Sequence, residues 1–227
     1  MSPAPRRKRA KRAPPARQDG LATRQQLLEA AGAVFAEHGY VKATSKEICA
    51  RAQANIAAVN YHFGGKDGLY AAVLEEAHAR LVSVEAVAAA AQSSIDPRIK
   101  LRMLLTRIVG EVAKRDQAAW ELRVLSREVL SQSPLMSGLI NNQIAPKARF
   151  MRAILAQIMD LPAEHPTVSR TLLSVMGPFL LLLIANRTLL QKVAPSLEPD
   201  ADGLTEHMAT FALAGMQAVA RKAKAAP

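Results

Sequence analysis

The residues with the clearest chemical potential lie in one short segment, Asn55 to Tyr70. Near its middle, Asn60, Tyr61 and His62 place an amide, a phenol and an imidazole in consecutive positions. Such groups can exchange hydrogen bonds with base edges and phosphates in the major groove of DNA. This chemistry requires a helix that presents one polar face to the duplex, so the signals that define the ends of such a helix matter next.

The segment carries the start and stop signals of a short helix. Asn55 is a good N-cap, because its side-chain carbonyl can accept a hydrogen bond from an amide in the first turn. Gly64-Gly65 predicts the end of the helix, and Lys66 begins the next one. Small side chains at Ala57 and Ala58 would let the helix approach another surface closely. A buried stripe is expected from three apolar residues at helical spacing, Ile56, Val59 and Phe63.

Two further helices are predicted before this segment. Thr23 can cap an amphipathic helix, with Gln26 as the reciprocal partner of a capping box, and Gly39 ends that helix. Thr44 and Ser45 then cap a second, short helix. Two short helices joined by a tight turn, with a longer helix across them, form a helix-turn-helix.

These residues resemble the N-terminal domain of TetR-family transcriptional regulators over Arg24 to Leu69, about a fifth of the chain. The run from Asn55 to Tyr61 is similar to the CecR-like branch of that family. Two positions depart from the commonest pattern, Cys49 and Asn60, and the second is expected to change which bases are read. The matching features are Ala30-Ala31, Phe35, Gly39-Tyr40, Thr44-Ser45, Ile48, Ala52, Tyr61-His62-Phe63, Lys66 and Leu69.

The expected DNA contacts combine the polar face of the third helix with flanking residues. Tyr61 and Lys66 are predicted to bind phosphates chiefly, while Asn60 and His62 are the candidates for reading bases. The full set is Arg24, Thr44, Ser45, Lys46, Asn55, Ala57, Ala58, Asn60, Tyr61, His62 and Lys66.

Composition predicts an all-α protein with a small N-terminal domain and a larger helical bundle. Half of the chain is apolar, and aromatic residues make up 4%. One cysteine excludes an internal disulfide, which fits a reducing cytoplasm. The five histidines show no metal-ligand spacing, and no nucleophile–base pair, phosphate loop or paired-carboxylate motif is present. We therefore predict no metal, no cofactor and no enzymatic activity.

The formal net charge of +11 is unevenly distributed. Residues 1–17 carry seven Lys or Arg residues and no acid, which leaves +4 for the rest. We expect residues 1–20 to be a disordered basic arm, because they lack apolar periodicity. The arm either follows phosphates or the minor groove of DNA, or is a solvated tail.

The predicted domains are the arm (1–20), a helix-turn-helix domain (21–66), a helical ligand-binding and dimerisation domain (67–223) and a tail (224–227). One long helix is expected over 66–92, and later helices over about 97–112, 117–133, 135–158, 166–193 and 202–222. Pro146 is expected to break the helix over 135–158.

The apolar run from Leu172 to Leu190 is predicted to be buried on all sides. Its uninterrupted apolar part, 175–185, is shorter than the ~20 residues of a membrane span. In TetR-like proteins the last two helices form a dimeric four-helix bundle, and the resemblance implies a homodimer here. The residues expected at that interface are Leu181, Leu182, Ile184, Phe211 and Ala214.

The sequence says least about an effector. An aromatic residue among methionines is typical of an apolar pocket, but also of an ordinary core. Arg123, Arg127 and Glu128 lie within helical reach of one another and favour a surface or interdomain ion pair. The candidate pocket residues are Met103, Trp120, Arg123, Phe150, Met151 and Met176.

The leading hypothesis is a sequence-specific, homodimeric DNA-binding regulator, most often a repressor, that a small molecule releases from its operator. One alternative is a ligand-binding or scaffold protein with a degenerate helix-turn-helix. Another is a sequence-tolerant architectural DNA binder that acts through the basic arm. The two caps and Lys66 favour the regulator, because a degenerate motif would not be expected to keep them.

Overall fold

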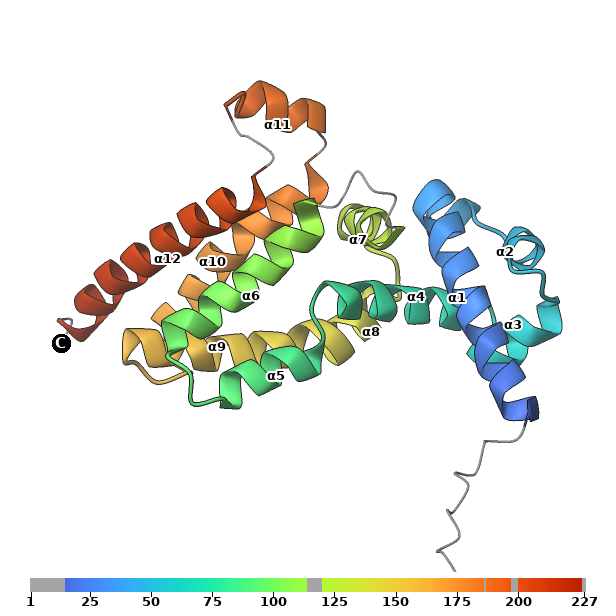
Figure 1. Ribbon diagram of the computed structural model, residues 1–227, viewed down its shortest axis with the longest axis horizontal. Coiled ribbons are helices and arrows are strands. Elements are labelled where there is room, and N and C mark those ends of the chain that lie inside the picture. The colour runs from blue at the N-terminus through green and yellow to red at the C-terminus, as the bar shows by residue number, and fades with distance from the viewer. Residues whose placement is uncertain (1–14, 114–119, 186, 197–199, 226–227) are drawn as a thin grey trace, which may run out of the picture.

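The computed structural model describes residues 15–113, 120–185, 187–196 and 200–225 (Figure 1). Every regular element in these ranges is helical, which confirms the predicted all-α fold. Helices α1 (Pro15–Lys42), α2 (Ser45–Arg51) and α3 (Ile56–Phe63) lie at one end of the molecule, and the C-terminus lies at the other. Helix α4 (Lys66–Leu81) leads from α3 into the rest of the chain.

The ends of the first helices test the predicted caps. Thr44 Oγ1 accepts a hydrogen bond from the Glu47 amide at 3.2 Å, and Asn55 Oδ1 accepts from the Ala58 amide at 2.9 Å. Gly64 ends α3 with a φ of 72°, a left-handed conformation that glycine adopts without steric cost. These three ends are as predicted.

The start of the first helix was predicted wrongly. Helix α1 begins at Pro15, so Thr23 lies inside it instead of capping it, and residues 15–20 of the predicted disordered arm are helical. Proline is favoured in a first turn, and Ala16, Arg17 and Gln18 are good helix formers, which extends the helix beyond the expected cap. Residues 1–14 of the arm lie outside the described residues.

One hydrophobic core joins the N-terminal helices to a helix that comes much later in the chain. Helices α1 to α4 pack together with α7 (Trp120–Ser131). At its centre the Phe35 ring meets the Tyr70 ring edge-on, with centroids 4.6 Å apart. Helix α7 contributes Trp120, Val124 and Leu125 to this core. The orientation of α1 is therefore set by α7 as well as by α4.

A second hydrophobic core lies towards the C-terminus. It joins α5 (Val84–Gln92), α6 (Pro97–Ala113), α9 (Ala145–Met159), α10 (Pro166–Ile184) and α12 (Ala201–Lys224). The short helix α8 (Met136–Leu139) and a π-helical turn, η2 (Ile140–Ile144), precede α9. Helix α11 (Arg187–Val193) follows α10 and precedes α12 in the chain, and it stands apart from the bundle (Figure 1).

Three predicted helix boundaries differ from the structure. The helix expected over 66–92 is broken at Val82 and Ser83, because Ser83 Oγ caps α5 by accepting from the Ala86 amide at 3.1 Å. Pro146 does not break the chain's helical course. It lies in the first turn of α9, where a missing N–H costs nothing, and the π-helical turn precedes it. The helix expected over 166–193 ends at Ile184.

Helix α10 is the most apolar long helix among the described residues. It has 19 residues and, by length and composition alone, could cross a membrane, although only one such helix occurs in the described ranges. Only 22% of its apolar window is buried within one chain. The prediction was that its own domain covers one face and a second subunit covers the other, and the second part stays a prediction. Its remaining apolar surface needs another cover.

Candidate DNA interface and C-terminal domain

Helix α3 presents the predicted polar face to solvent. Tyr61 is 85% exposed, and Ala57 and Asn60 are also exposed. His62 is half-buried, and its ring lies edge-on to that of Tyr61 with centroids 4.9 Å apart. Ala58 is half-buried against the first core. The amide and the phenol are thus free to meet a surface, while the imidazole lies at the edge of that face.

The opposite face of α3 corrects one prediction. Val59 is fully buried and Phe63 is half-buried, but Ile56 is 53% exposed although it was expected on the buried stripe. The first turn of α3 projects beyond the helices that cover Val59. An exposed isoleucine beside Ala57 can contact the methyl group of thymine, so Ile56 joins the candidate DNA-facing set.

Lys66 and Arg24 are held by aromatic rings. The Lys66 ammonium lies 4.7 Å from the centre of the Tyr40 ring, and the Tyr40 hydroxyl donates to Asp67 Oδ1 at 2.6 Å. This hydrogen bond to Asp67 raises the pKa of Tyr40. The Arg24 guanidinium lies 5.1 Å from the Phe63 ring centre. Both cations are pre-positioned beside α3, as phosphate contacts require.

The start of α2 supplies the remaining candidates at this end of the molecule. Thr44 and Lys46 are exposed, and Ser45 is half-buried. Asn55, at the start of α3, is exposed, with its side chain used as the cap. These positions flank α3 and can reach the phosphates on either side of a groove.

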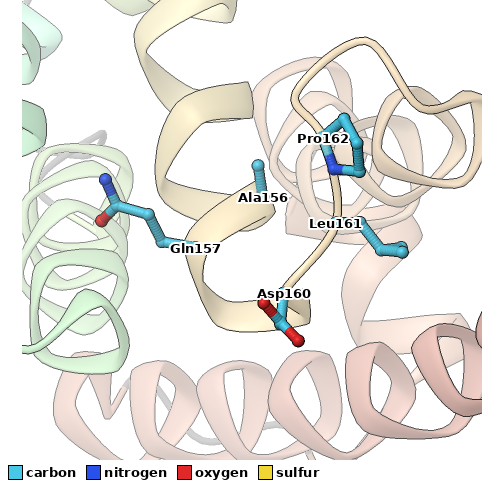
Figure 2. A pocket seen from close by; sticks show the side chains of 5 residues that line it. All are labelled: Ala156, Gln157, Asp160, Leu161 and Pro162. Carbon is cyan, nitrogen blue, oxygen red and sulfur yellow. The ribbon is translucent and has the colours of Figure 1, made fainter.

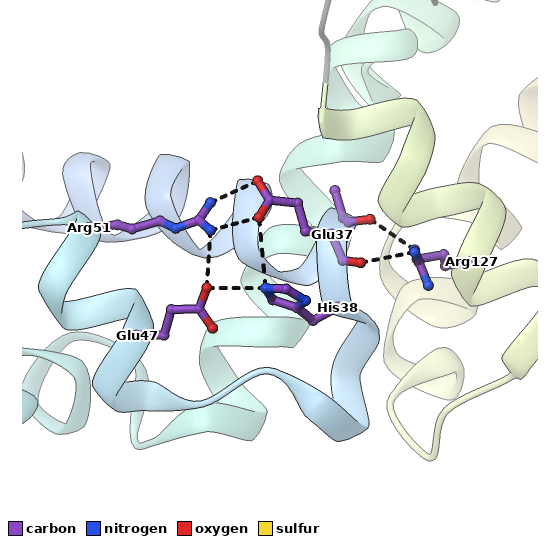
Figure 3. Close-up of polar contacts among 6 residues, drawn as sticks. Glu37, His38, Glu47, Arg51 and Arg127 are labelled. Carbon is purple, nitrogen blue, oxygen red and sulfur yellow. Dashed lines mark hydrogen bonds and ion pairs between the residues drawn. The ribbon is translucent and has the colours of Figure 1, made fainter.

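A polar cluster fastens α2 to the end of α1 (Figure 3). Arg51 Nη1 and Nη2 donate to the two carboxylate oxygens of Glu37 at 2.8 and 2.6 Å, and Nη2 also donates to Glu47 at 3.0 Å. The hydrogen bonds from Arg51 lower the pKa of Glu37. His38 Nε2 lies 3.2 Å from Glu47 Oε1. Possible ligand atoms of Glu37, His38 and Glu47 lie within 4.8 Å of one another, but Arg51 already supplies the positive charge between the carboxylates.

Arg127 of α7 extends this cluster to the rest of the protein (Figure 3). Its Nε donates to the Ala36 carbonyl at 2.9 Å, and its Nη2 donates to the Glu37 carbonyl at 3.0 Å. A kink at Gly39, with a φ of 73°, follows these carbonyls. Arg127 therefore caps the main part of α1. Arg127 was expected in a surface or interdomain ion pair; it does join two parts of the chain, but through backbone carbonyls.

Glu128 is instead fully buried and bonded within the first core. Its carboxylate accepts from the Tyr70 hydroxyl at 2.8 Å and from the Ser133 amide at 2.9 Å. Tyr70 lies on α4, so this hydrogen bond ties α4 to α7. Burial, followed by the hydrogen bond to Glu128, raises the pKa of the Tyr70 hydroxyl.

Trp120, a predicted effector contact, also belongs to the first core. Its Nε1 donates to Glu29 Oε2 on α1 at 2.8 Å. The Arg80 guanidinium lies 5.1 Å from its ring and donates to Glu29, Glu76 and Glu121. Nothing in the local sequence pattern signals this network, because its members come from α1, α4 and α7.

The other predicted effector contacts are not gathered around one site. Met151 is buried in the second core, Phe150 and Met176 pack against that core, and Met103 and Arg123 are exposed. Because Trp120 lies in the first core, the prediction of one shared pocket lined by this set is not supported. A hollow of about 340 Å³ at the end of α9 has none of these residues in its lining (Figure 2), which is formed by Ala156, Gln157, Asp160, Leu161 and Pro162.

The predicted dimer contacts include exposed apolar side chains of α10 and α12. Phe211 is 77% exposed, Leu181 is 53% exposed and Ala214 is exposed. Leu182 and Ile184 are half-buried. Leu173 on α10 and Val219 on α12 extend the exposed apolar surface, although the sequence analysis did not select them.

The fold and the polar face of α3 define a helix-turn-helix protein with a separate helical domain. Residues 27–73 match the family model described as bacterial regulatory proteins of the tetR family. Residues 97–218 match the C-terminal domain of the HTH-type transcriptional dual regulator CecR. The chain therefore belongs to the TetR family of DNA-binding transcriptional regulators, with a C-terminal domain of the CecR type.

Individual relatives agree with this assignment. The chain is 28% identical over 180 residues to the HTH-type transcriptional dual regulator CecR of Shigella flexneri, covering 75% of this chain and 80% of that protein. It is 39% identical over 62 residues to the HTH-type transcriptional repressor AcnR of Corynebacterium glutamicum, covering 27% and 33% of the two chains.

Solved structures share the fold. A TetR-like regulator from Rhodococcus sp. RHA1 superposes with a TM-score of 0.60 at 23% identity, over 90% of this chain and all of that one. The complex of SmeT with triclosan superposes with a TM-score of 0.64 at 22% identity, over 86% and 91% of the two chains.

Proposed function

We propose that the protein is a cytoplasmic repressor that binds its operator as a homodimer and leaves it when a small molecule occupies the C-terminal domain. The observation that carries this proposal is the exposed polar face of α3, held between the Asn55 cap and the Gly64 end. The relative AcnR is described as a repressor, which supports repression. SmeT forms a complex with triclosan, which supports binding of a small molecule. CecR is described as a dual regulator, so activation at some promoters is the second outcome to test.

On DNA, α3 lies in the major groove in this proposal. The exposed amide of Asn60 reads a base edge, with His62 at the margin of the face, and Ile56 and Ala57 contact thymine methyl groups. Tyr61 and Lys66 bind phosphates, and the second of these is already held over Tyr40. Arg24 and the start of α2, Thr44 to Lys46, reach the backbone on the flanks.

The dimer in this proposal is formed by α10 and α12. Their exposed apolar side chains, Leu173, Leu181 and Phe211 among them, would be an aggregation liability on a monomer. A two-fold interface places the same patch of both subunits face to face. It also fixes the separation of the two α3 helices, which an operator with half-sites about 34–36 Å apart requires.

Release from the operator requires the effector to favour a different separation of the two α3 helices. Helix α4 begins at the end of α3 and passes through the first core to the edge of the second. Because α7 is bonded to α1 through Arg127 and to α4 through Glu128, we expect α1 to α4 and α7 to move as one body. A ligand in the second core then shifts this body relative to α10 and α12.

The test is sequencing of genomic fragments that the purified full-length protein retains. The expected result is a shared two-fold symmetric motif with half-sites one helical turn apart. Retention without a shared motif would instead support an architectural DNA binder, and no retention would support a degenerate helix-turn-helix. Fluorescence anisotropy of a labelled operator, measured as candidate small molecules are added, then tests separately whether an effector releases the protein from DNA.

A further inference from the structure

Lys147 is a buried cation whose hydrogen bonds are with His78 and not with a carboxylate. It lies in the first turn of α9 and is only 7% exposed. Its Nζ lies 2.7 Å from His78 Nδ1 and donates to the His78 carbonyl at 3.2 Å. Among the described residues no acidic side chain forms an ion pair with Lys147. Buried lysines are rare unless paired, and the charge of Glu85 acts on Lys147 without forming an ion pair.

The charge is present at neutral pH. Burial lowers the pKa of Lys147 to about 8, against the opposing charge of Glu85, so most molecules remain protonated at pH 7. Burial and the Lys147 charge lower the pKa of His78 to about 4, so its ring is neutral and Nδ1 can accept from the ammonium. The pair therefore holds one net positive charge inside the protein.

A buried acceptor lies one helical turn before Lys147. The Oε1 atom of Gln143, in the π-helical turn η2, is buried and has no hydrogen-bond partner. Gln143 precedes Lys147 by four residues, about one turn along the segment that runs from η2 into α9. Asn142 holds η2 against α4, because its Nδ2 donates to Glu75 Oε1 at 2.6 Å. An unsatisfied buried acceptor costs about 1–3 kcal/mol and calls for a donor.

We infer that Lys147 and Gln143 form the polar end of the effector site, and that the effector is a small organic acid that also carries a hydroxyl group. The carboxylate pairs with the Lys147 ammonium, and the hydroxyl donates to Gln143 Oε1. This inference rests on the proposed function, since it names the ligand class of that regulator. The π-helical turn fits the assignment, because such turns are frequent at functional sites.

The same contacts connect the site to the DNA-reading end. The His78 carbonyl lies in the last turn of α4, and Lys147 is one of two cations that cap this helix end. The other is Arg107 of α6, whose Nε donates to the Leu81 carbonyl at 3.1 Å. An anion that draws the Lys147 ammonium away from His78 removes one of these caps and frees the end of α4 to shift.

The test measures ligand binding to the full-length protein without DNA. The probes are salicylate and 3-hydroxydecanoate, with salicylamide as the uncharged analogue and benzoate as the analogue without a hydroxyl. We expect at least one hydroxy acid to bind by calorimetry and to raise Tm, and salicylamide to bind at least about tenfold more weakly. K147M, which removes the buried charge and replaces it with an unbranched side chain of similar length, should weaken binding by about tenfold or more.

Two further variants make the result decisive. Q143L should remove the preference for salicylate over benzoate while leaving benzoate binding nearly unchanged. K100M is the matched control, because Lys100 is also buried but donates to the Ala91 carbonyl at the end of α5. Failure of both hydroxy acids to bind, or unchanged binding by K147M, overturns the inference. Operator binding is measured separately, so either failure leaves the proposed DNA-binding function standing.

Discussion

The indole ring of Trp120 in α7 lies directly on Gly32 in α1. A Cβ atom at residue 32 would lie 2.4 Å from a carbon of the ring, a distance that real Cβ contacts do not reach. The absent side chain lets the ring settle on the helix and brings Nε1 to Glu29, one turn earlier in α1. The packing of Trp120 on α1 therefore requires a residue without a side chain at position 32.

Gly32→Ala should destabilise the protein. Alanine favours a helix interior over glycine by roughly 0.5–1 kcal/mol, but displacing the Trp120 ring costs typically 1–3 kcal/mol. We expect a lower Tm and a red-shifted emission from this tryptophan, the only one in the chain. Gly110→Ala in α6 is the control, because a Cβ there meets nothing within 4 Å, and it should not lower Tm. A Gly32→Ala protein as stable as wild type would contradict the packing argument.

The proposed roles of the α3 residues, base reading and phosphate binding, predict different effects of mutation. Asn60→Ala should relax preference at one position in each half-site, at a cost of about 1–3 kcal/mol for the preferred base. Tyr61→Phe and Lys66→Ala should weaken binding about equally on all operator variants. Binding to a panel of single-base operator variants distinguishes these outcomes. A uniform loss from Asn60→Ala would remove that residue from the base-reading set.

The apolar surface of α10 and α12 predicts a variant that cannot dimerise. Phe211→Glu places a charge where a two-fold interface would bury it, so we expect monomers or insoluble protein in sedimentation velocity. Leu130→Glu on α7 is the control, because Leu130 is exposed to a similar degree and lies outside the proposed interface. Wild-type protein that sediments as a stable monomer at micromolar concentration would refute the proposed dimer.

The basic arm makes a prediction about salt. Residues 1–14 carry six Lys or Arg residues, and each neutralised phosphate adds about 0.9 to the slope of log K against log salt. Deleting the arm should flatten the slope by up to about five units per protomer if all six engage DNA. Preference for the operator over a scrambled duplex should persist, since α3 is unchanged. An unaltered slope would show that the arm is only solvated.

His78 predicts a loss of stability in mild acid. Its pKa of about 4 lies below the ordinary value of 6.5, so the native ring takes up a proton less readily than the unfolded one. Stability should therefore fall as the pH drops from about 6.5 towards 4, by at most roughly 3 kcal/mol. His78→Gln should remove this part of the dependence of Tm on pH. His207→Gln, on the exposed side of α12, should leave the profile as in wild type.

The sequence predicted those parts of the fold that depend on local chemistry. The caps at Thr44 and Asn55 and the end at Gly64 depend on side chains within three residues of the helix end, and all three are correct. The start of α1 was missed because good helix formers before Thr23 outweigh a cap. The break before α5 was missed because Ser83 is a cap hidden in an otherwise apolar run.

Contacts between distant helices could not be read from the chain. Arg127 was expected in a surface or interdomain ion pair, whereas it donates to backbone carbonyls on α1, which no side-chain pattern reveals. Trp120 was a candidate for an effector pocket or for the core, and the core alternative is the one the structure shows, because the ring packs on Gly32 of the distant helix α1. Lys147 carried no signal in the sequence, since the burial of its side chain becomes visible only when α4 and α9 are placed together.

The first core also determines how this regulator could be recombined with others. The core of the DNA-binding helices α1 to α4 is completed by α7, which follows α5 and α6 in the chain although those two helices belong to the second core. No single crossover point in the chain therefore separates the helices of the first core from those of the second. A chimera joined after α4 would deprive Phe35 and Tyr70 of Val124 and Leu125, and would leave Arg127 without the carbonyls that it caps. Exchange of α1 to α4 between relatives should succeed only when α7 is exchanged with them.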